Sequence, residues 1–200
     1  MAERVDLRTW MFRYRSYTPL PFLALMIWFA HPTPASMLAG LAVVLLGEGI
    51  RFWGVAFVGA ETRTTGTVGG TYLVTNGPFA HVRNPLYVGN MLLYAGIGIM
   101  SLALFPGLLF LALLWFGVQY SMIVAREEEY LAQRFGEEFS EYAKNVPRFV
   151  PRLTPFDSGR PMPKSLNVVE GLASERRTLQ AIGLVALLIV GKFFYLHVTG

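Results

Sequence analysis

Long, nearly uncharged apolar stretches are the feature that most restricts how this chain can fold. They alternate with shorter polar segments, and a helix needs about 17–25 mainly apolar residues to cross the hydrocarbon core of a bilayer. Soluble domains are roughly 45–50% apolar and 25% charged, whereas this chain is 54% hydrophobic and 15% charged. The sequence therefore predicts an all-α, polytopic membrane protein.

Five apolar blocks are candidates for transmembrane helices. The first is short and must recruit flanking residues to span a bilayer. The third and fourth are predicted to be antiparallel neighbours, because only Phe105-Pro106-Gly107 interrupts them. We therefore expect about five transmembrane helices, at residues 19–30, 35–59, 86–104, 108–125 and 179–198.

One further helix is predicted in the charged segment 126–178. Within REEEYLAQRFGEEFSEYAKN, residues 126–145, four apolar side chains recur at spacings of four, four and three, which places them on one helix face. These are Leu131, Phe135, Phe139 and Tyr142. We expect an amphipathic helix at the membrane surface.

The distribution of cations predicts the orientation of the chain. Lys and Arg are concentrated before the first span, in the 60–85 loop and in the 126–178 segment, and they are absent from the loops on the opposite side. The positive-inside rule then places the N-terminus and both polar segments in the cytoplasm and the C-terminus on the other side. Both polar segments can thus build one cytoplasmic pocket. The compact form suggests a bacterial inner membrane.

Composition also excludes several kinds of site. The chain has no cysteine, so thiol catalysis and thiolate metal sites are impossible. His31 and His197 fall far from His81 in the predicted topology, and we expect no metal site. The net charge of +4 is explained by membrane orientation, so we expect no nucleic-acid partner.

Two charged residues lie inside the second apolar block. Glu48 and Arg51 are three residues apart and share a helix face. A charge at the bilayer centre costs at least about 2.5–3.5 kcal/mol on insertion scales. Two interpretations are open: an ion pair or snorkelling arginine with no further role, or a pair that lines a polar cavity.

The segment LVTNGPFAHVRNPLYVGN, residues 73–90, joins a turn to the start of the third span. Gly77-Pro78 predicts a turn, and Pro85 suits the first turn of a helix. Asn84 is then a candidate N-cap, and the positive end of the helix dipole would lie near Arg83. Such an end can bind a carboxylate or another anion, although an ordinary helix start also explains the pattern.

An acidic run, Glu127, Glu128 and Glu129, ends the fourth apolar block. Such a run is often only a solvated helix face. In the predicted topology, however, these acids face Arg83 across the cytoplasmic pocket. VPRFVP, residues 146–151, adds Arg148 between two prolines. By itself this motif is typical of a loop at the membrane interface.

Together the two motifs resemble the membrane methyltransferases that include isoprenylcysteine carboxyl methyltransferases and phospholipid N-methyltransferases. The resemblance covers about residues 45–151: LVTNGPFAHVRNPLYVGN comes first, and EEEYLAQRFGEEFSEYAKNVPRF follows after a helical hairpin. We therefore expect a membrane core over 1–151 that contains these motifs, a cytoplasmic linker over 152–178 and an additional C-terminal transmembrane helix over 179–200 that lies beyond the region of resemblance.

The resemblance also implies that S-adenosyl-L-methionine binds at these motifs on the cytoplasmic side. The candidate cofactor-binding residues are Gly77, Pro78, His81, Arg83, Asn84, Pro85, Tyr87, Gly89, Glu127 and Glu128. One departure stands out, because the family often has histidine where this chain has Asn84. An asparagine can donate a hydrogen bond but cannot carry a proton at neutral pH.

The candidate catalytic residues are Arg83, Glu128 and Arg148. A sulfonium methyl donor is already activated, so the protein must mainly align the acceptor and exclude water. We expect Arg83 and the helix start to hold the cofactor carboxylate, and Glu128 to hold its amino group or ribose or to act as a base. Arg148 would anchor an anionic acceptor or a lipid head group. The acceptor would be lipophilic, would enter from the bilayer and would present a carboxylate or an amine.

Two other functions remain open from the sequence. Membrane reductases of sterols and steroids, which use a nicotinamide cofactor, have a related Arg-His-Pro motif, but here LYVGN follows Pro85 and the VPRF segment favours methyl transfer. A lipid-binding membrane protein of the same fold without catalysis is the other alternative, and Asn84 is the feature that supports it.

Overall fold

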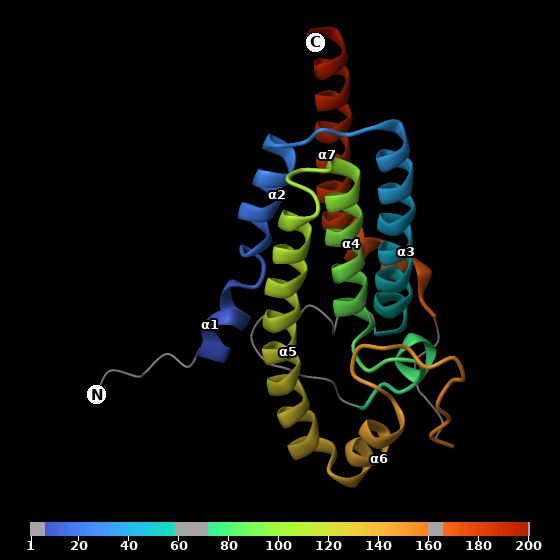
Figure 1. The fold of residues 1–200 in the computed structure, drawn as a ribbon. Coiled ribbons are helices and arrows are strands. Elements are labelled where there is room, and N and C mark those ends of the chain that lie inside the picture. Colours follow the sequence, from blue (N-terminus) through green and yellow to red (C-terminus); the bar gives the residue numbers. More distant parts are fainter. Residues whose placement is uncertain (1–6, 59–71, 160–165, 200) are drawn as a thin grey trace. The chain divides into compact units, whose positions relative to one another are not determined.

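The computed structural model describes residues 7–58, 72–159 and 166–199, and the regular secondary structure in this part of the chain is helical, without a strand (Figure 1). The elements in chain order are α1 (Leu7–Tyr14), α2 (Pro19–Trp28), α3 (Pro34–Val58), the 3-10 helix η2 (Gly77–Ala80), α4 (Pro85–Ser101), α5 (Gly107–Phe135), α6 (Glu137–Asn145) and α7 (Val168–Thr199). The predicted all-α class is confirmed.

Each of the five predicted apolar blocks contains a helix. Within the described residues, three helices are long and apolar enough to cross a membrane, namely α3, α5 and α7. The other two, α2 and α4, are apolar but shorter, with 10 and 17 residues. The protein is thus an integral membrane protein, and the five-span topology stays a prediction.

The third apolar block begins where the sequence predicts and ends earlier. Proline stands at the first position of α4, where its missing N–H has no helical partner to lose. At the other end the helix stops at Ser101 rather than Leu104. Leu102 and Leu104 both have positive φ, 49° and 44°, and the Ser101 hydroxyl accepts the N–H of Ala103 at 3.3 Å. This reversed backbone cannot continue a right-handed helix.

The prediction of one separate surface helix over residues 126–145 was wrong in part. The first half belongs to α5, which runs without interruption to Phe135, and only α6 is separate. Nothing at Ala125 or Arg126 can break a helix, because charged residues continue one as readily as apolar residues. The break falls at Gly136, which adopts φ of +53°, a conformation that glycine adopts without steric cost.

The last helix also begins earlier than its apolar block predicts. α7 starts at Val168, and residues 168–178, which the sequence indicated as linker, form its first turns. The side-chain oxygen of Asn167 accepts the N–H of Glu170 at 3.1 Å, which caps the helix start. These turns are polar, so hydropathy alone does not reveal them.

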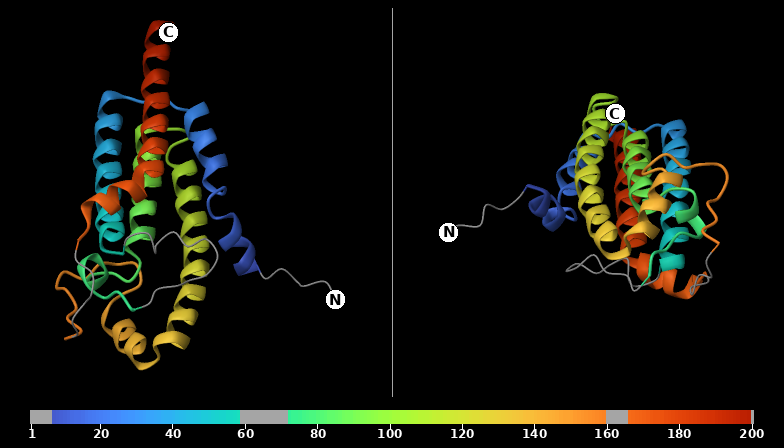
Figure 2. Two further views of the ribbon diagram at one scale, coloured as in Figure 1. Left: turned by 180° about the vertical axis from the view of Figure 1, so that it is seen from behind. Right: turned by 90° about the horizontal axis from the view of Figure 1, so that it is seen from below.

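The described structure divides into two compact units. The first comprises residues 1–46, 91–126 and 180–200, and the second comprises 47–90 and 127–179. In the first unit, α4 and α5 lie side by side (Figure 2), and the fully buried Phe116 stacks on Tyr94 with ring centroids 4.0 Å apart. The buried Gln119 accepts a hydrogen bond from Thr18 at 2.9 Å, so its polar group is satisfied.

Glycines bring α3 and α4 into close contact within the first unit. A Cβ atom on Gly96 would lie 2.6 Å from Val44 Cγ2 and 2.7 Å from the carbonyl oxygen of Gly40. Only a residue without a side chain fits this crossing. Membrane helices commonly pack through such small residues because lipid provides no hydrophobic drive between helices.

This packing gives a first prediction. Gly96→Val should lower the stability of the folded protein by about 1–3 kcal/mol or more, because the new side chain meets backbone atoms that cannot retreat. Gly117→Val is the matched control, since a Cβ on Gly117 would meet nothing within 4 Å. Thermal unfolding in detergent measures both. Equal midpoints for the two variants would contradict the close α3–α4 contact.

Candidate functional site

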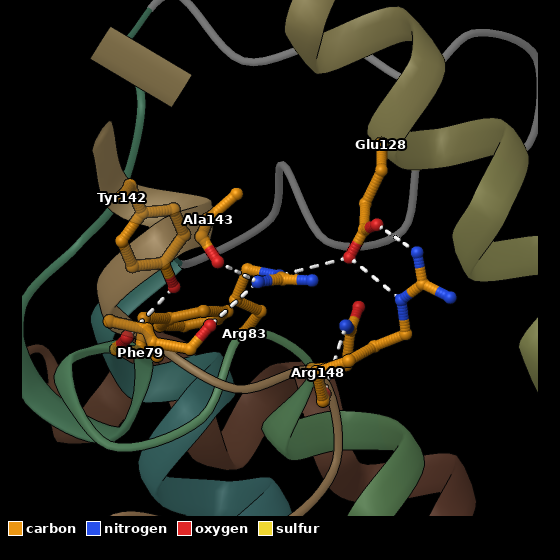
Figure 3. Close-up of polar contacts among 8 residues, drawn as sticks. Phe79, Arg83, Glu128, Tyr142, Ala143 and Arg148 are labelled. Carbon is orange, nitrogen blue, oxygen red and sulfur yellow. Dashed lines mark hydrogen bonds and ion pairs between the residues drawn. The ribbon is translucent and has the colours of Figure 1, made fainter. Parts of the chain in front are cut away.

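Arg83 is the centre of a polar cluster in the second unit (Figure 3). It lies between η2 and α4. Its Nε donates to Glu128 Oε1 at 3.0 Å, and its Nη1 donates to the carbonyl oxygens of Ala143 and Val146, both at 2.6 Å. The Arg83 and Glu128 side chains are only 12% and 14% exposed. The sequence prediction that Arg83 faces the acidic run is confirmed for Glu128.

Glu128 also binds a second arginine. Arg148 Nε donates to Glu128 Oε1 at 3.2 Å, and Arg148 Nη2 donates to Glu128 Oε2. Both carboxylate oxygens are therefore engaged by guanidinium groups. The Arg148 side chain is 42% exposed, and its hydrogen bond to Glu128 raises the pKa of Arg148 above its ordinary value. We call Arg83, Glu128 and Arg148 the arginine–glutamate cluster.

The first turn of α4 is tied to the same region. Asn84 Nδ2 donates to the carbonyl oxygen of Arg148 at 3.1 Å. The backbone N–H of Arg83 donates to the carbonyl oxygen of Pro147 at 2.9 Å. Tyr87 donates its hydroxyl to Glu127 Oε1 at 2.9 Å. Helix α4 therefore starts next to two carboxylates and two guanidinium groups. The Asn84 amide thus holds the backbone at Arg148 in place. The sequence predicted only a helix cap at Asn84.

The structure does not bring the remaining predicted residues into the cluster. Gly77 has φ of +56°, and a Cβ there would lie 2.8 Å from the Phe57 ring, so this turn requires glycine. His81 Nδ1 lies 2.9 Å from the carbonyl oxygen of Arg152 and serves to hold the loop. Pro78 and Pro85 are buried, and Gly89 packs against α3. These residues shape the site's surroundings.

An apolar cluster supports the polar one. Phe139, Tyr142 and Val146 are buried together with Leu73, and Leu131 and Phe135 pack against them. The four apolar residues predicted to share a face thus pack together. They belong to two helices, α5 and α6. Tyr142 donates to the carbonyl oxygen of Phe79 at 2.8 Å. Burial raises the pKa of Tyr142, the neighbouring Arg83 lowers it in part, and Glu128 raises it, so Tyr142 stays a neutral donor.

Sequence reasoning missed one ionic partner in the second unit. Arg51 lies 3.5 Å from Glu48, as an ion pair requires, but its stronger partner is Glu175 of α7 at 2.8 Å. This contact was hard to predict from the sequence, because Glu175 lies in the segment 152–178, which low hydropathy indicated as a linker. Within the described residues, no three His, Asp or Glu side chains gather to hold a metal ion.

Comparison with known proteins decides the family. The model of the phospholipid methyltransferase family matches residues 35–138 of this chain. The chain belongs to the phospholipid methyltransferase family. This confirms the resemblance seen in the two motifs. Arg83 and Glu128 lie inside the matched region, whereas Arg148 and the whole of α7 lie outside it.

Individual relatives agree with this membership. The cobalt-zinc-cadmium resistance protein CzcN of Cupriavidus metallidurans is 34% identical over 123 residues, which are 61% of this chain and 52% of CzcN. The protein-S-isoprenylcysteine O-methyltransferase of Schizosaccharomyces pombe is 37% identical over 81 residues, 40% of this chain and 34% of the yeast protein. The chain spans about half the length of the curated relatives it matches, or less. No solved structure matches this chain.

The buried Tyr142 gives a prediction about pH. Tyrosine ordinarily ionises near pH 10, and the raised pKa means that the unfolded chain loses this proton before the folded chain does. The stability that Tyr142 contributes is therefore complete below about pH 10 and is lost as the pH rises further. Tyrosinate absorbance, followed from about pH 9 to 11 in the folded protein, measures the ionisation.

One single variant isolates the residue in that titration. Tyr142→Phe should remove no tyrosinate signal between about pH 9 and 11, because burial raises the pKa of Tyr142 above its ordinary value. Loss of signal in this range from Tyr142→Phe would show that Tyr142 is accessible to solvent and would contradict its burial next to the cluster.

Proposed function

We propose that this protein is a membrane-embedded S-adenosyl-L-methionine-dependent methyltransferase whose acceptor is a lipophilic carboxylate. The observation that carries the proposal is the arginine–glutamate cluster at the start of α4, in a chain of the phospholipid methyltransferase family. The distribution of cations supports a site on the cytoplasmic side, with the C-terminus on the opposite side. The compact form suggests a bacterial inner membrane.

The residues at the start of α4 fit the amino-acid end of this cofactor. That end carries a carboxylate and an ammonium group. The cluster offers guanidinium groups for the first and the carboxylates of Glu127 and Glu128 for the second or for the ribose. The N-terminus of α4 adds the positive end of a helix dipole.

The two arginines differ in their freedom to bind a ligand. Arg83 is mostly buried and already donates to Glu128 and to two carbonyl oxygens, so it acts as a positioning residue. Arg148 is more exposed and has only Glu128 as a side-chain partner among its described contacts. We therefore assign the cofactor carboxylate to Arg148 and the α4 start.

The state of Glu128 favours an acceptor that needs no base. Both of its oxygens accept hydrogen bonds from arginines, so Glu128 already serves to hold the two guanidinium groups in place. When bound, S-adenosyl-L-methionine would supply a sulfonium methyl group that is already activated for transfer, and a carboxylate acceptor would need no base to receive it. The isoprenylcysteine O-methyltransferase relatives support this choice.

Binding of the cofactor provides the first test. Calorimetry on detergent-purified protein should show saturable binding of S-adenosyl-L-methionine and none of a nicotinamide cofactor. Glu128→Gln should weaken binding about tenfold or more, because hydrogen bonds to charged groups contribute about 1.5–3 kcal/mol. Glu128→Gln is cleaner than Arg83→Ala, which would leave the carbonyl oxygens of Ala143 and Val146 without their donor.

Glu141→Gln is the matched control for that measurement. Glu141 is an exposed residue of α6, so the same chemical change there should leave the affinity as in the wild type. Nicotinamide binding in place of S-adenosyl-L-methionine binding by a folded protein would favour a reductase. Binding of neither cofactor would favour a lipid-binding protein without catalysis.

The acceptor class is tested separately. Membranes containing the protein, a lipid extract and S-adenosyl-L-methionine with a tritiated methyl group should yield label in the organic phase. A methyl ester releases methanol in alkali, whereas an N-methyl group does not. The proposal predicts alkali-labile label that Glu128→Gln reduces. Alkali-stable label would indicate an amine acceptor, and would return Glu128 to the role of candidate base.

A further inference from the structure

In the second unit, successive residues on one face of the first turns of α7 contact α3. The N–H of Asn167 donates to the carbonyl oxygen of Ala56 at 2.9 Å. One turn later Gly171 packs so closely that a Cβ there would lie 3.0 Å from Ala56 Cβ and 3.1 Å from Phe52 Cε2. Glu175 comes one turn after Gly171, at the spacing that keeps residues on one helix face.

Glu175 meets a charged residue of α3. Arg51 Nη2 lies 2.9 Å from Glu175 Oε1 and 2.8 Å from Oε2. The Glu175 side chain is completely buried and that of Arg51 is 11% exposed. Thr178 Oγ1, at 3.4 Å from the same nitrogen, lies one turn further along α7. A buried charge is tolerated only when a partner satisfies it, so each residue holds the other in place.

The same arginine also holds α4. Arg51 Nη1 donates to Asn90 Oδ1. The neighbouring Gly89 lies against the arginine stem and the α3 backbone, where a Cβ would come 3.3 Å from Arg51 Cδ and 2.7 Å from the Gly47 carbonyl oxygen. Asn90 follows Tyr87 by three residues, so both lie on the same side of α4.

We propose that Glu175 is a positioning residue for the cofactor site and that α7 is therefore part of this site's scaffold. The proposal rests on the function proposed above and goes beyond it, because the family match ends before α7. Glu175 fixes the Arg51 guanidinium, Arg51 fixes Asn90, and Asn90 sets the rotation and depth of the α4 start that carries Asn84 and Tyr87.

This linkage acts on binding because the α4 start contributes several contacts at once. Asn84 holds the Arg148 loop and Tyr87 holds Glu127. A rotation of α4 changes both contacts together, and small displacements of positioning groups have large effects on the alignment of a ligand. Loss of the Glu175 charge leaves Arg51 without its anionic partner from α7, so Arg51 no longer constrains Asn90.

The test compares Glu175→Gln with Glu170→Gln, the same change five residues earlier in the same helix, where the side chain is only partly buried and accepts a hydrogen bond from Asn167. Calorimetric affinity for S-adenosyl-L-methionine is measured well below the unfolding temperature of each variant. We expect Glu175→Gln to weaken binding about tenfold and Glu170→Gln to leave it unchanged. Glu175→Asp, which keeps the charge, should restore part of the loss and serves if Glu175→Gln does not fold.

A double variant separates positioning through Arg51 from any other effect. If Glu175 acts through Arg51, Arg51→Gln with Glu175→Gln should bind no more weakly than Arg51→Gln alone. Wild-type affinity in a folded Glu175→Gln protein of lowered unfolding temperature would overturn the inference and leave Glu175 a purely structural residue. In that case a weakened Glu128→Gln would still support the proposed function, whereas a wild type without cofactor binding would overturn both.

Discussion

The buried guanidinium of Arg83 is the interaction on which the candidate site depends. A charge removed from water must be satisfied by protein groups, and Arg83 finds them in three places: the Glu128 carboxylate and the carbonyl oxygens of Ala143 and Val146. Those groups come from the end of α5 and from α6 with its following residue. One side chain thus requires two separate segments to meet at the start of α4.

The chemistry assigned to the protein follows from how this requirement is met. Because Arg83 and Glu128 bind each other, the more exposed Arg148 is left as the group that can exchange a protein partner for a ligand. Such a site can recognise a charged cofactor and orient it, and it suits a reaction in which the donor is already activated. A methyl transfer to a carboxylate is a reaction of this kind.

Local sequence patterns predicted most of the helices and the central contact of the site, between Arg83 and Glu128. Among the described residues, apolar length identified the long helices, and Pro85 marked the start of α4. The expectation that the two polar segments meet predicted the contact of Arg83 with Glu128. Hydropathy could not reveal the first turns of α7, because many of their residues are polar. Glu175 is buried there only because it pairs with Arg51, which lies far away in the sequence. Nor could spacing show that α5 continues to Phe135, since the break depends on the backbone conformation of Gly136.

A structure of the detergent-purified protein with bound S-adenosyl-L-homocysteine tests the central claim most directly. The account predicts that the amino-acid end of the ligand lies against the start of α4, that its carboxylate has taken Arg148 as a partner, and that Arg83 has kept its bonds to Glu128 and the two carbonyl oxygens. Ligand density remote from Arg148 and Glu128, or an Arg83 side chain that had left Glu128 for the ligand, would contradict it.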